Sequence, residues 1–510
     1  MKKRKLVLLG LDSADWKILD PLIKEGCLPN FRHIVKNGSC ARLRSTLPPI
    51  TPPAWASIFT GVNPGKHGIF DFVRFADNKI QYTTSRDVEV PYVWELMGKE
   101  RIIAFNIPAA YPPTRSENTI MICGFGSPST SSNFTYPKEI KWEILKAVPG
   151  YEVSLGANDH LLEKGIVHEK KSLSMQIIKN LDCKKRAARY LLENKAWDTA
   201  FIVFSSPDWI QHFFIHEFFA AEKKSQTEVA MVYKSIDDFL GYLIKKGYNI
   251  MVVSDHGAAE IKRKFFLNTY LMRKGLLKLK NPGMMKRTLR FLGISRDFFT
   301  TVWPFSSIYE LLAGSKTVIG LGARILPTQK LKTDDIDNEK SVAFLISADG
   351  SVKVRPESGS EEIRRMLAEC TNPDGRAIFK DVFLGSEIYW GGAAEKAPSI
   401  LAVPHEDIQL RETIEPDIFG GIDPKKEKNG GHSRFGIFAA YGPDFRKKGG
   451  MQELSVVDIT PTILAYFGYS PPSFMDGKFI PIFEAESKSG SNFKYKTQSA
   501  IKKLKRLKKR

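Results

Sequence analysis

Short apolar stretches alternate with amphipathic, helix-like stretches along the first half of the chain. The apolar stretches end in polar residues and read KLVLLGLD, RIIAFNIP, NTIMICGFG, TAFIVFSSPD and NIMVVSDHG. Runs of this kind are typical of buried strands, and their alternation with helices favours a parallel sheet covered on both faces. We therefore predict an α/β fold: a three-layer αβα sandwich with a largely parallel central sheet.

Acidic residues follow three of these predicted strands. Asp12, Asp208 and Asp255 each come just after an apolar run. In open α/β sheets, ligands bind at the edge formed by the carboxyl ends of the strands, because loops and helix N-termini converge there. We therefore expect the three carboxylates to meet at one edge of the sheet.

The pattern changes in the middle of the chain. After a basic stretch, an apolar segment and an acidic linker, SVAFLISADGSVKVRPESG predicts a hairpin that turns at Asp349-Gly350, and EEIRRMLAEC predicts a short helix. RFGIFAAYG then predicts a strand that returns to the large sheet, and VVDITPTILAYFG a helix that starts near Asp458. The predicted domains are a first part of the catalytic core at 1–258, an inserted smaller α+β cap at 259–429, the closing part of the core at 430–485 and a basic tail at 486–510.

The composition is that of a folded protein with room for more than one core. The chain has 510 residues, of which 43% are hydrophobic and 26% charged, so disorder and small disulfide scaffolds are excluded. Five scattered cysteines without a Cys-x-x-Cys pair argue against a zinc ribbon and fit a reducing compartment.

The run Leu6–Leu11 is too short for a signal peptide, and residues 303–327 hold too many charges and glycines for a membrane span. We expect a cytoplasmic protein.

Positive charge is concentrated at the C-terminus. The formal net charge is +20, and residues 494–510 hold nine lysines and arginines and no acid. Such a tail is usually a solvated end. Because Ala500, Ile501, Leu504 and Leu507 recur at helical spacing, a second hypothesis is a basic amphipathic helix that contacts an anionic inner membrane face or nucleic acid. Unchanged vesicle and nucleic-acid binding after deletion of this tail would exclude that hypothesis.

Thr51 begins the segment TPPAWASIFTG, which predicts a helix. Two prolines suit a first helical turn, and Gly61 suits the C-terminal cap. The positive end of the helix dipole then lies at Thr51, which favours a bound phosphate and eases ionisation of the hydroxyl. Threonine is also a common N-cap, so Thr51 alone fits a purely structural role as well.

Two acid–histidine pairs have the spacing of metal ligands. Asp208 and His212 stand four residues apart in SSPDWIQHFF, so on a helix they share one face, which His216 continues. Asp255 and His256 directly follow an apolar strand and would present a carboxylate and an imidazole at the sheet edge. A solvated surface pair or a core histidine is the structural alternative for the helical pair.

A further imidazole completes the set. His432 lies in a glycine-rich loop of KNGGHSRFGIF, where an ordinary turn histidine is the alternative. Mixed aspartate and histidine ligation suits zinc, our first expectation, or manganese better than calcium. Two divalent ions about 4 Å apart can hold the attacking and leaving oxygens of a displacement at phosphorus. The candidate ligands are Asp12, Asp208, His212, Asp255, His256 and His432.

The order of these motifs resembles the alkaline phosphatase superfamily, and within it the type I phosphodiesterase/nucleotide pyrophosphatase family. The similar phrases are LLGLDSAD, TPPAWASIFTGVNPGKHGIFDF, SSPDWIQHF, VVSDHG, GGHSRFGIFAAYGPDF and VVDITPTILAYFG. The chain also resembles a group of prokaryotic proteins described as predicted phosphohydrolases or phosphomutases. The insertion and the tail stand outside the resemblance.

This resemblance implies a mechanism. One metal ion would be bound by Asp12, Thr51, Asp255 and His256, and the other by Asp208, His212 and His432. Thr51 would attack phosphorus and form a phosphothreonine intermediate, which water then hydrolyses. The implied activity is that of a phosphodiesterase or phosphatase on a small phosphate ester.

One position departs from the family pattern. Nucleotide pyrophosphatases carry a phosphoryl-binding asparagine shortly after the Gly-Ile pair, and Phe72 of GIFDF stands at that place. This difference argues against direct specificity for nucleotide diesters. His67 and Asp71 are close enough in sequence to shape the site, and we assign them no role.

Other functions fit part of the pattern. A metal-dependent phosphomutase would return the phosphate to the same substrate, and the cap would decide between transfer and hydrolysis. Phosphonate or sulfate ester cleavage stays open, although no Cys-x-Pro-x-Arg sulfatase motif surrounds Thr51. A catalytically silent protein that binds anionic surfaces is the remaining alternative, and metal content would distinguish it.

Overall fold

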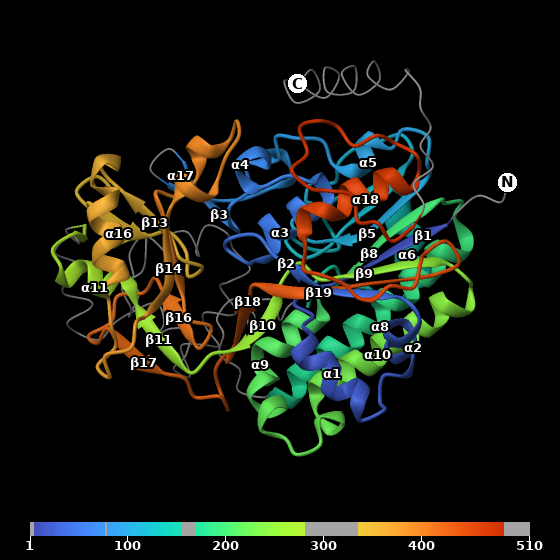
Figure 1. The fold of residues 1–510 in the computed structure, drawn as a ribbon, viewed down its shortest axis with the longest axis horizontal. Coiled ribbons are helices and arrows are strands. Elements are labelled where there is room, and N and C mark those ends of the chain that lie inside the picture. The colour runs from blue at the N-terminus through green and yellow to red at the C-terminus, as the bar shows by residue number, and fades with distance from the viewer. Residues whose placement is uncertain (1–4, 77–78, 156–169, 281–334, 484–510) are drawn as a thin grey trace.

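The computed structural model describes residues 5–76, 79–155, 170–280 and 335–483 (Figure 1). The apolar segment at 303–327 and the basic tail, on which two of the sequence-based predictions rest, lie outside the described residues. All five cysteines are unpaired. Within the described ranges, no helix has both the length and the apolar character needed to cross a membrane.

A ten-stranded sheet forms the centre of the larger lobe. The five apolar runs predicted from the sequence are β1, β5, β6, β8 and β9, and all pairings among them are parallel. The strand order is β20 (Gly449–Gly450), β2 (Ser39–Arg44), β19 (Phe435–Tyr441), β9 (Asn249–Val253), β1 (Leu6–Leu11), β8 (Thr199–Phe204), β5 (Ile102–Ile107), β6 (Thr119–Cys123) and β7 (Thr135–Tyr136), with β21 (Leu454–Ser455) also paired to β2. The returning strand β19 was predicted correctly, and it pairs antiparallel to both β9 and β2.

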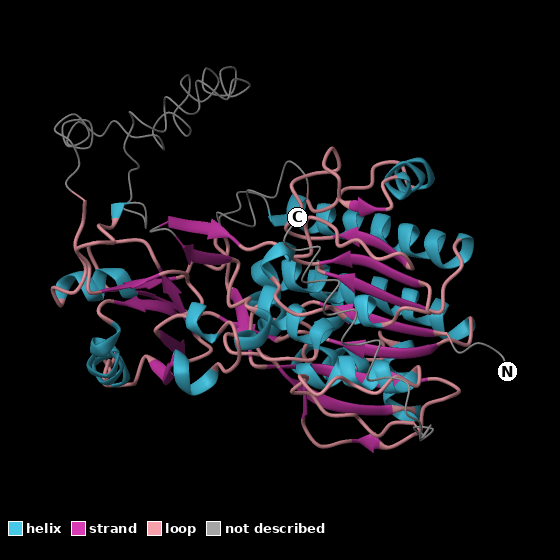
Figure 2. Cartoon of the chain, turned by 90° about the horizontal axis from the view of Figure 1, so that it is seen from above, coloured by secondary structure: helices cyan, strands magenta, loops and turns pink. Residues whose placement is uncertain are grey.

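Helices cover both faces of this sheet, which confirms the three-layer αβα prediction (Figures 1 and 2). One face carries α3 (Thr51–Thr60), α5 (Val93–Leu96) and α18 (Ile459–Tyr466). The opposite face carries α1 (Trp16–Lys24), α2 (Pro29–Asn37), α8 (Lys170–Asn194), α9 (Ser206–Ala220) and α10 (Glu228–Lys245). The short helix α4 (Pro64–His67) follows α3, and α6 (Glu139–Ala147) follows β7. Asp458 is the N-cap of α18, as predicted.

Close packing of α3 on β1 fixes where the helix begins. A Cβ added at Gly10 of β1 would lie 2.4 Å from the Trp55 ring, so only glycine permits this approach. Trp55 is 1% exposed and is part of the main hydrophobic core. The contact therefore holds the N-terminal end of α3, with Thr51, beside the end of β1, where Asp12 follows.

A smaller lobe has its own hydrophobic core, formed by buried residues between Phe265 and Ile414. Its strands form the sheets β12-β13-β15-β14 and β16-β11-β17. Its elements are β11 (Arg263–Phe266), α11 (Leu267–Arg273), β12 (Ala343–Leu345), β13 (Ser351–Val354), α16 (Ser360–Ala368), β14 (Phe379–Leu384), α17 (Gly385–Ile388), β15 (Ile400–Pro404), β16 (Ile408–Arg411) and β17 (Phe419–Gly421). The predicted hairpin is β12–β13, with Gly350 at φ 96° in its turn, and the predicted short helix is α16.

The smaller lobe, which we call the cap, also receives residues from early in the chain. Val73 and Phe75 of the hairpin β3 (Val73–Ala76) and β4 (Lys79–Tyr82) pack against its core, which the sequence pattern did not indicate. Between the two lobes, β10 (Gly257–Glu260) pairs antiparallel with β18 (Gly430–Ser433). The domain boundaries proposed from the sequence stay predictions.

Candidate active site

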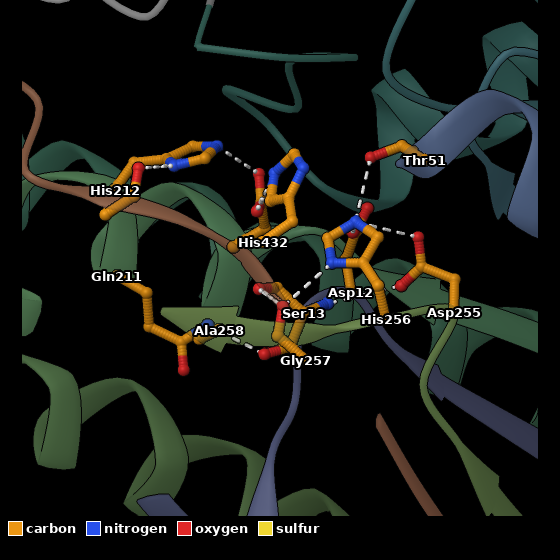
Figure 3. A network of polar contacts seen from close by, with 12 residues as sticks. Asp12, Ser13, Thr51, Gln211, His212, Asp255, His256, Gly257, Ala258 and His432 are labelled. Carbon is orange, nitrogen blue, oxygen red and sulfur yellow. Dashed lines mark hydrogen bonds and ion pairs between the residues drawn. The ribbon is translucent and has the colours of Figure 1, made fainter. Parts of the chain in front are cut away.

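The predicted metal ligands and Thr51 come together at the carboxyl edge of the large sheet (Figure 3). Asp12 directly follows β1, and Asp255 and His256 lie just after β9. Asp208 and His212 lie on the first turns of α9, so they share one face of the helix as predicted. Polar residues that follow strands far apart in the sequence therefore lie close together.

Asp12, Asp255 and His256 form the first group. Their potential ligand atoms all lie within 4.8 Å of one another, and all three side chains are buried. His256 Nε2 is 3.2 Å from Asp255 Oδ2 and 3.6 Å from Asp12 Oδ1. The imidazole nitrogen and the two carboxylates thus point at a common centre.

Asp208, His212 and His432 form the second group. Their potential ligand atoms also lie within 4.8 Å of one another. Asp208 lies between the two imidazoles, with His212 Nε2 3.1 Å from Oδ2 and His432 Nε2 3.4 Å from Oδ1. This group is slightly more open than the first, since the His432 side chain is 15% exposed.

The two groups adjoin one another, and Thr51 lies against the first. The rings of His256 and His432 have their centroids 4.1 Å apart and are tilted by 36° to one another. Thr51 Oγ1 is 3.5 Å from His256 Nε2 (Figure 3). The N-cap of α3 is Ile50, and Thr51 is the first helical residue. The hydroxyl therefore points into the site and does not cap the helix.

Backbone carbonyls orient the imidazoles. His212 Nδ1 is 2.9 Å from the Gly430 carbonyl, and His256 Nδ1 is 3.1 Å from the Gly257 carbonyl. A carbonyl oxygen only accepts, so Nδ1 carries the proton and donates in each case. Nε2 then presents its lone pair to the centre of each group, which is the arrangement that metal-bound histidines require.

A chain of buried hydrogen bonds holds the Asp255 carboxylate. The Ser13 N–H donates to Asp255 Oδ1 at 3.2 Å, and Ser13 has a left-handed backbone with φ 62°. Gln211 Nε2 donates to the Ser13 carbonyl at 2.9 Å, and the Tyr233 hydroxyl donates to Gln211 Oε1 at 3.1 Å. The sequence analysis missed these residues. Only the position of Gln211 beside His212 in DWIQHF offered a signal.

The electrostatics of the first group favour a bound cation. Burial, reinforced by the Asp255 carboxylate, raises the pKa of Asp12 well above its usual range, and burial has the same effect on the pKa of Asp255. Burial also holds the pKa of His256 well below its usual range. A bound divalent cation would stabilise the ionised carboxylates of Asp12 and Asp255. The His256 imidazole is neutral and can therefore act as a metal ligand.

The second group differs because its one carboxylate, Asp208, has two histidine partners. Burial alone would raise the pKa of Asp208, but His212 and His432 outweigh it and hold this pKa well below its usual range. Burial lowers the pKa of His212 to about 4, against the opposing charge of Asp208. An ionised carboxylate beside a neutral imidazole is a suitable ligand pair.

The donor atoms fit two metal ions. Four buried polar atoms of the groups have no hydrogen-bond partner within the part of the chain that the structure describes: Asp12 Oδ1, Asp208 Oδ1, Asp255 Oδ2 and His432 Nε2. Buried polar atoms are rarely left without partners unless an ion or a functional role accounts for them. Carboxylate and imidazole donors in each group match the ligand preferences of zinc and manganese.

The structure corrects one expectation about a single residue and adds contacts for two others. His432 was expected in a loop, but it lies on β18, where pairing with β10 fixes its direction. His216 continues the face of α9 but is not part of a metal group, and its Nδ1 is 2.6 Å from Glu260 Oε1. Phe72 is half-buried, and its ring packs edge-on against Phe125.

The two residues near Phe72 without an assigned role have structural partners. His67 is fully buried, with Nε2 2.9 Å from Ser57 Oγ, and burial lowers its pKa to about 3. Asp71 accepts a hydrogen bond from the Ser347 hydroxyl of the cap. His67 thus supports the loop after α3, and Asp71 joins this loop to the smaller lobe.

Comparison with known proteins agrees with this geometry. Residues 6–434 match the model of the family described as type I phosphodiesterase / nucleotide pyrophosphatase. Phosphonoacetate hydrolase from Sinorhizobium meliloti, solved with phosphonoformate, superimposes with a TM-score of 0.54 at 14% identity, over 88% of this chain and 92% of that chain. Human ectonucleotide pyrophosphatase/phosphodiesterase 5 gives a TM-score of 0.50 at 16% identity, over 93% and 97%. No curated protein matches the sequence.

The fold is that of an alkaline phosphatase superfamily hydrolase. The chain belongs to the type I phosphodiesterase/nucleotide pyrophosphatase family, whose model covers Thr51 and all six candidate ligands. It is therefore an enzyme that hydrolyses phosphoester-type bonds, in a family of metal-dependent enzymes that act on small phosphoester substrates.

Proposed function

We propose that this chain is a two-metal phosphoric ester hydrolase in which Thr51 is the nucleophile. The observation that carries the proposal is the position of Thr51 Oγ1, 3.5 Å from His256 Nε2, at the start of α3 and beside both ligand groups. A hydroxyl that neither caps its helix nor bonds to a backbone carbonyl in this position is available for chemistry.

Each ligand group would hold one ion. Asp12, Asp255 and His256, with Thr51, would bind the first, and Asp208, His212 and His432 the second. When bound, divalent ions of this kind stabilise a deprotonated hydroxyl and the charge that develops on the oxygens around phosphorus. Zinc is our first choice and manganese the second, on the basis of the mixed donors.

Thr51 would attack phosphorus through Oγ1. The hydroxyl proton passes to solvent, the new Oγ1–P bond forms, and the bond from phosphorus to the leaving oxygen breaks, with that oxygen taking up a proton. The phosphothreonine is then hydrolysed by water, which restores the Thr51 hydroxyl and releases the phosphate. Pro52 and Pro53 carry no N–H, so the first turn of α3 offers few donors to the phosphoryl oxygens, and their charge must be balanced mainly by the two ligand groups.

The direct test measures hydrolysis of an activated aryl phosphate monoester and of the matching diester. Activity should vanish on chelation and return with zinc or manganese. Thr51→Ala should lower turnover at least about a thousandfold without changing the thermal unfolding of the protein, whereas Thr51→Ser, which keeps the hydroxyl, should retain part of it. Substantial turnover by the folded alanine variant would rule out the proposed nucleophile.

A further inference from the structure

Two short strands connect the two ligand groups. β10 begins at Gly257, directly after His256 of the first group, and β18 carries His432 of the second group opposite Ala258. The strands pair antiparallel, with Gly257 opposite Ser433. The separation of these two strands therefore decides how the His432 imidazole lies relative to the His256 imidazole.

The carboxylate of Asp15 bridges the two strands. Its Oδ2 accepts hydrogen bonds from the Ala258 N–H of β10 at 3.3 Å and from the Ser433 hydroxyl of β18 at 3.1 Å. Its Oδ1 accepts from the Lys17 N–H at 2.9 Å, which makes Asp15 the N-cap of α1, and the exposed Lys17 ammonium lies 3.8 Å from Oδ2. Asp15 is buried, so both of its oxygens are held between a helix and two strands.

This contact is close because Gly257 has no side chain. A Cβ added at Gly257 would lie 2.5 Å from Asp15 Oδ2 and 2.4 Å from Ser433 Oγ. The Gly257 carbonyl accepts hydrogen bonds from Ser13 Oγ and from His256 Nδ1, both at 3.1 Å. The start of β10 is therefore packed against Asp15 and hydrogen-bonded to the imidazole of the first group.

Capping of α1 does not by itself account for a buried acid at this position. Serine and asparagine cap helices as well as aspartate does, whereas burial raises the pKa of Asp15, against the hydrogen bonds from its neighbours, because the charge is costly there. An ionised carboxylate differs from these two residues because it only accepts hydrogen bonds. It can accept from α1, β10 and β18 at once, while the amide nitrogen of an asparagine would turn donor hydrogens toward the Ala258 N–H.

We infer that Asp15 is a positioning residue for the two-metal site: by holding β10 and β18 together, it sets the place of His432 relative to His256 and hence the separation of the two ions. Asp15 is not a member of either ligand group, so it acts through the strands and not by binding metal. This inference rests on the proposed function, because it concerns the geometry of the same site.

The test uses the full chain loaded with two manganese ions per molecule. Two such ions about 4 Å apart are magnetically coupled, and the electron paramagnetic resonance spectrum reports this coupling. Asp15→Asn keeps a good N-cap for α1 but removes the bridging acceptor, so the coupled signal should weaken or shift relative to the wild type. Turnover of the aryl ester should fall about 10- to 100-fold, as for other residues that orient metal ligands.

Ser433→Ala is an independent variant, because it removes one hydroxyl from β18 and leaves the cap of α1 untouched. It should change the coupling in the same direction as Asp15→Asn. The double variant should add little to Asp15→Asn, because both substitutions act through one contact. Asp20→Asn, which removes an exposed carboxylate from α1, is the matched control and should behave as the wild type.

The inference is overturned if Asp15→Asn and Ser433→Ala give the wild-type signal at equal manganese content. A role in folding alone would lower the thermal unfolding temperature and leave the coupling in the folded protein unchanged. Absence of coupling in the wild type itself would contradict the two-metal proposal, so this outcome is distinct from a failure of the role given to Asp15.

Discussion

Asp71 is a buried carboxyl at the boundary between the two lobes. It accepts hydrogen bonds from the Phe72 N–H at 2.6 Å and from Ser351 Oγ at 3.5 Å, in addition to Ser347 Oγ. Burial, reinforced by the nearby Asp349 carboxylate, raises the pKa of Asp71 from an ordinary 3.8 to about 8. Between these two pH values the folded protein holds a proton that the unfolded chain has released.

The pH dependence of stability should therefore carry the signature of Asp71. Because the folded state binds the extra proton, its contribution to stability is complete below about pH 4 and is lost as the pH rises through 8, at up to about 1.4 kcal/mol per pH unit. Asp71→Asn mimics the protonated acid. In metal-free protein, its free energy of unfolding should match that of the wild type near pH 4 and exceed it by a growing amount as the pH rises to 8.

A suitable control is Asp238→Asn, which removes an exposed carboxylate from α10 and should leave the wild-type pH dependence in place. Denaturant unfolding at several pH values measures the slope. If the Asp71 and control variants lose stability equally with rising pH, Asp71 is ionised in the folded protein and the argument from its burial is wrong.

Local spacing was sufficient to predict the two acid–histidine pairs but not what orients them. Asp208 with His212, and Asp255 with His256, are close in sequence, so a helix or a strand end brings each pair together without knowledge of the fold. Ser13 and Gln211 act through neighbours far away along the chain. Their roles depend on tertiary contacts, which have no local pattern.

Among the elements, β18 depends on a glycine for its position against α9. A Cβ added at Gly430 would lie 2.3 Å from the Gln211 carbonyl oxygen and 2.8 Å from His212 Cα. No rotation of a side chain relieves a clash with backbone, so the strand or the helix would have to move. Both carry ligands of the second group.

Gly430→Ala should therefore weaken metal binding as well as folding. We expect a loss of about 1–3 kcal/mol of stability, as for other overpacked sites, and a weaker second metal site with the first retained. Gly421→Ala is the matched control, because a Cβ at Gly421 of β17 meets no atom within 4 Å. Zinc titration of both variants is the measurement; an alanine variant at 430 that binds two ions as the wild type does would contradict the role given to this contact.

Six strands of the large sheet, β1, β5, β6, β8, β9 and β19, were predictable because each is an apolar run bounded by polar residues. The strands β2, β7, β20 and β21 were not predicted, since they are short or carry few apolar residues. In contrast, β18 is GGHS, with two glycines and no apolar residue, so its sequence does not predict a strand. It is a strand because it pairs with β10. The hairpin β12–β13 was found from its Asp-Gly turn. The contribution of β3 and β4 to the cap was missed because it depends on packing between segments far apart in sequence.

The two lobes are joined at several points besides the chain crossings. Lys66 Nζ forms a 2.5 Å ion pair with Asp476, whose other oxygen accepts a hydrogen bond from Asn63 Nδ2 at 2.9 Å. Asn63 Nδ2 also donates to the Trp390 carbonyl of the cap at 3.0 Å, and the Ala393 N–H donates to the Gly65 carbonyl at 2.8 Å. The bonds of Asn63 and Gly65 therefore fasten the cap to the core.

Metal binding should stabilise the protein as a whole. The six candidate ligands come from segments between Asp12 and His432, so the unfolded chain cannot present them together. Ions that bind only the folded state raise the unfolding temperature. At a free zinc concentration one hundred times the dissociation constant, each site contributes about 2.7 kcal/mol. Differential scanning calorimetry with zinc and with excess chelator measures this shift.

Single ligand variants should divide the stabilisation between the sites. His432→Ala should lose the part due to the second ion, while His405→Ala, a histidine outside both groups, should keep the full shift. A zinc-dependent shift that is unchanged in His432→Ala would show that the second group does not bind the ion.

The proposed mechanism requires Thr51 Oγ1 to be the atom that forms the bond to phosphorus. Metal-loaded protein mixed with an activated aryl phosphate and quenched in acid within the first turnover should yield a covalent phosphoprotein, and peptide mass spectrometry should place the phosphate on Thr51. Release of the aryl product with no phosphate on the protein, or with phosphate on a different residue, would contradict it.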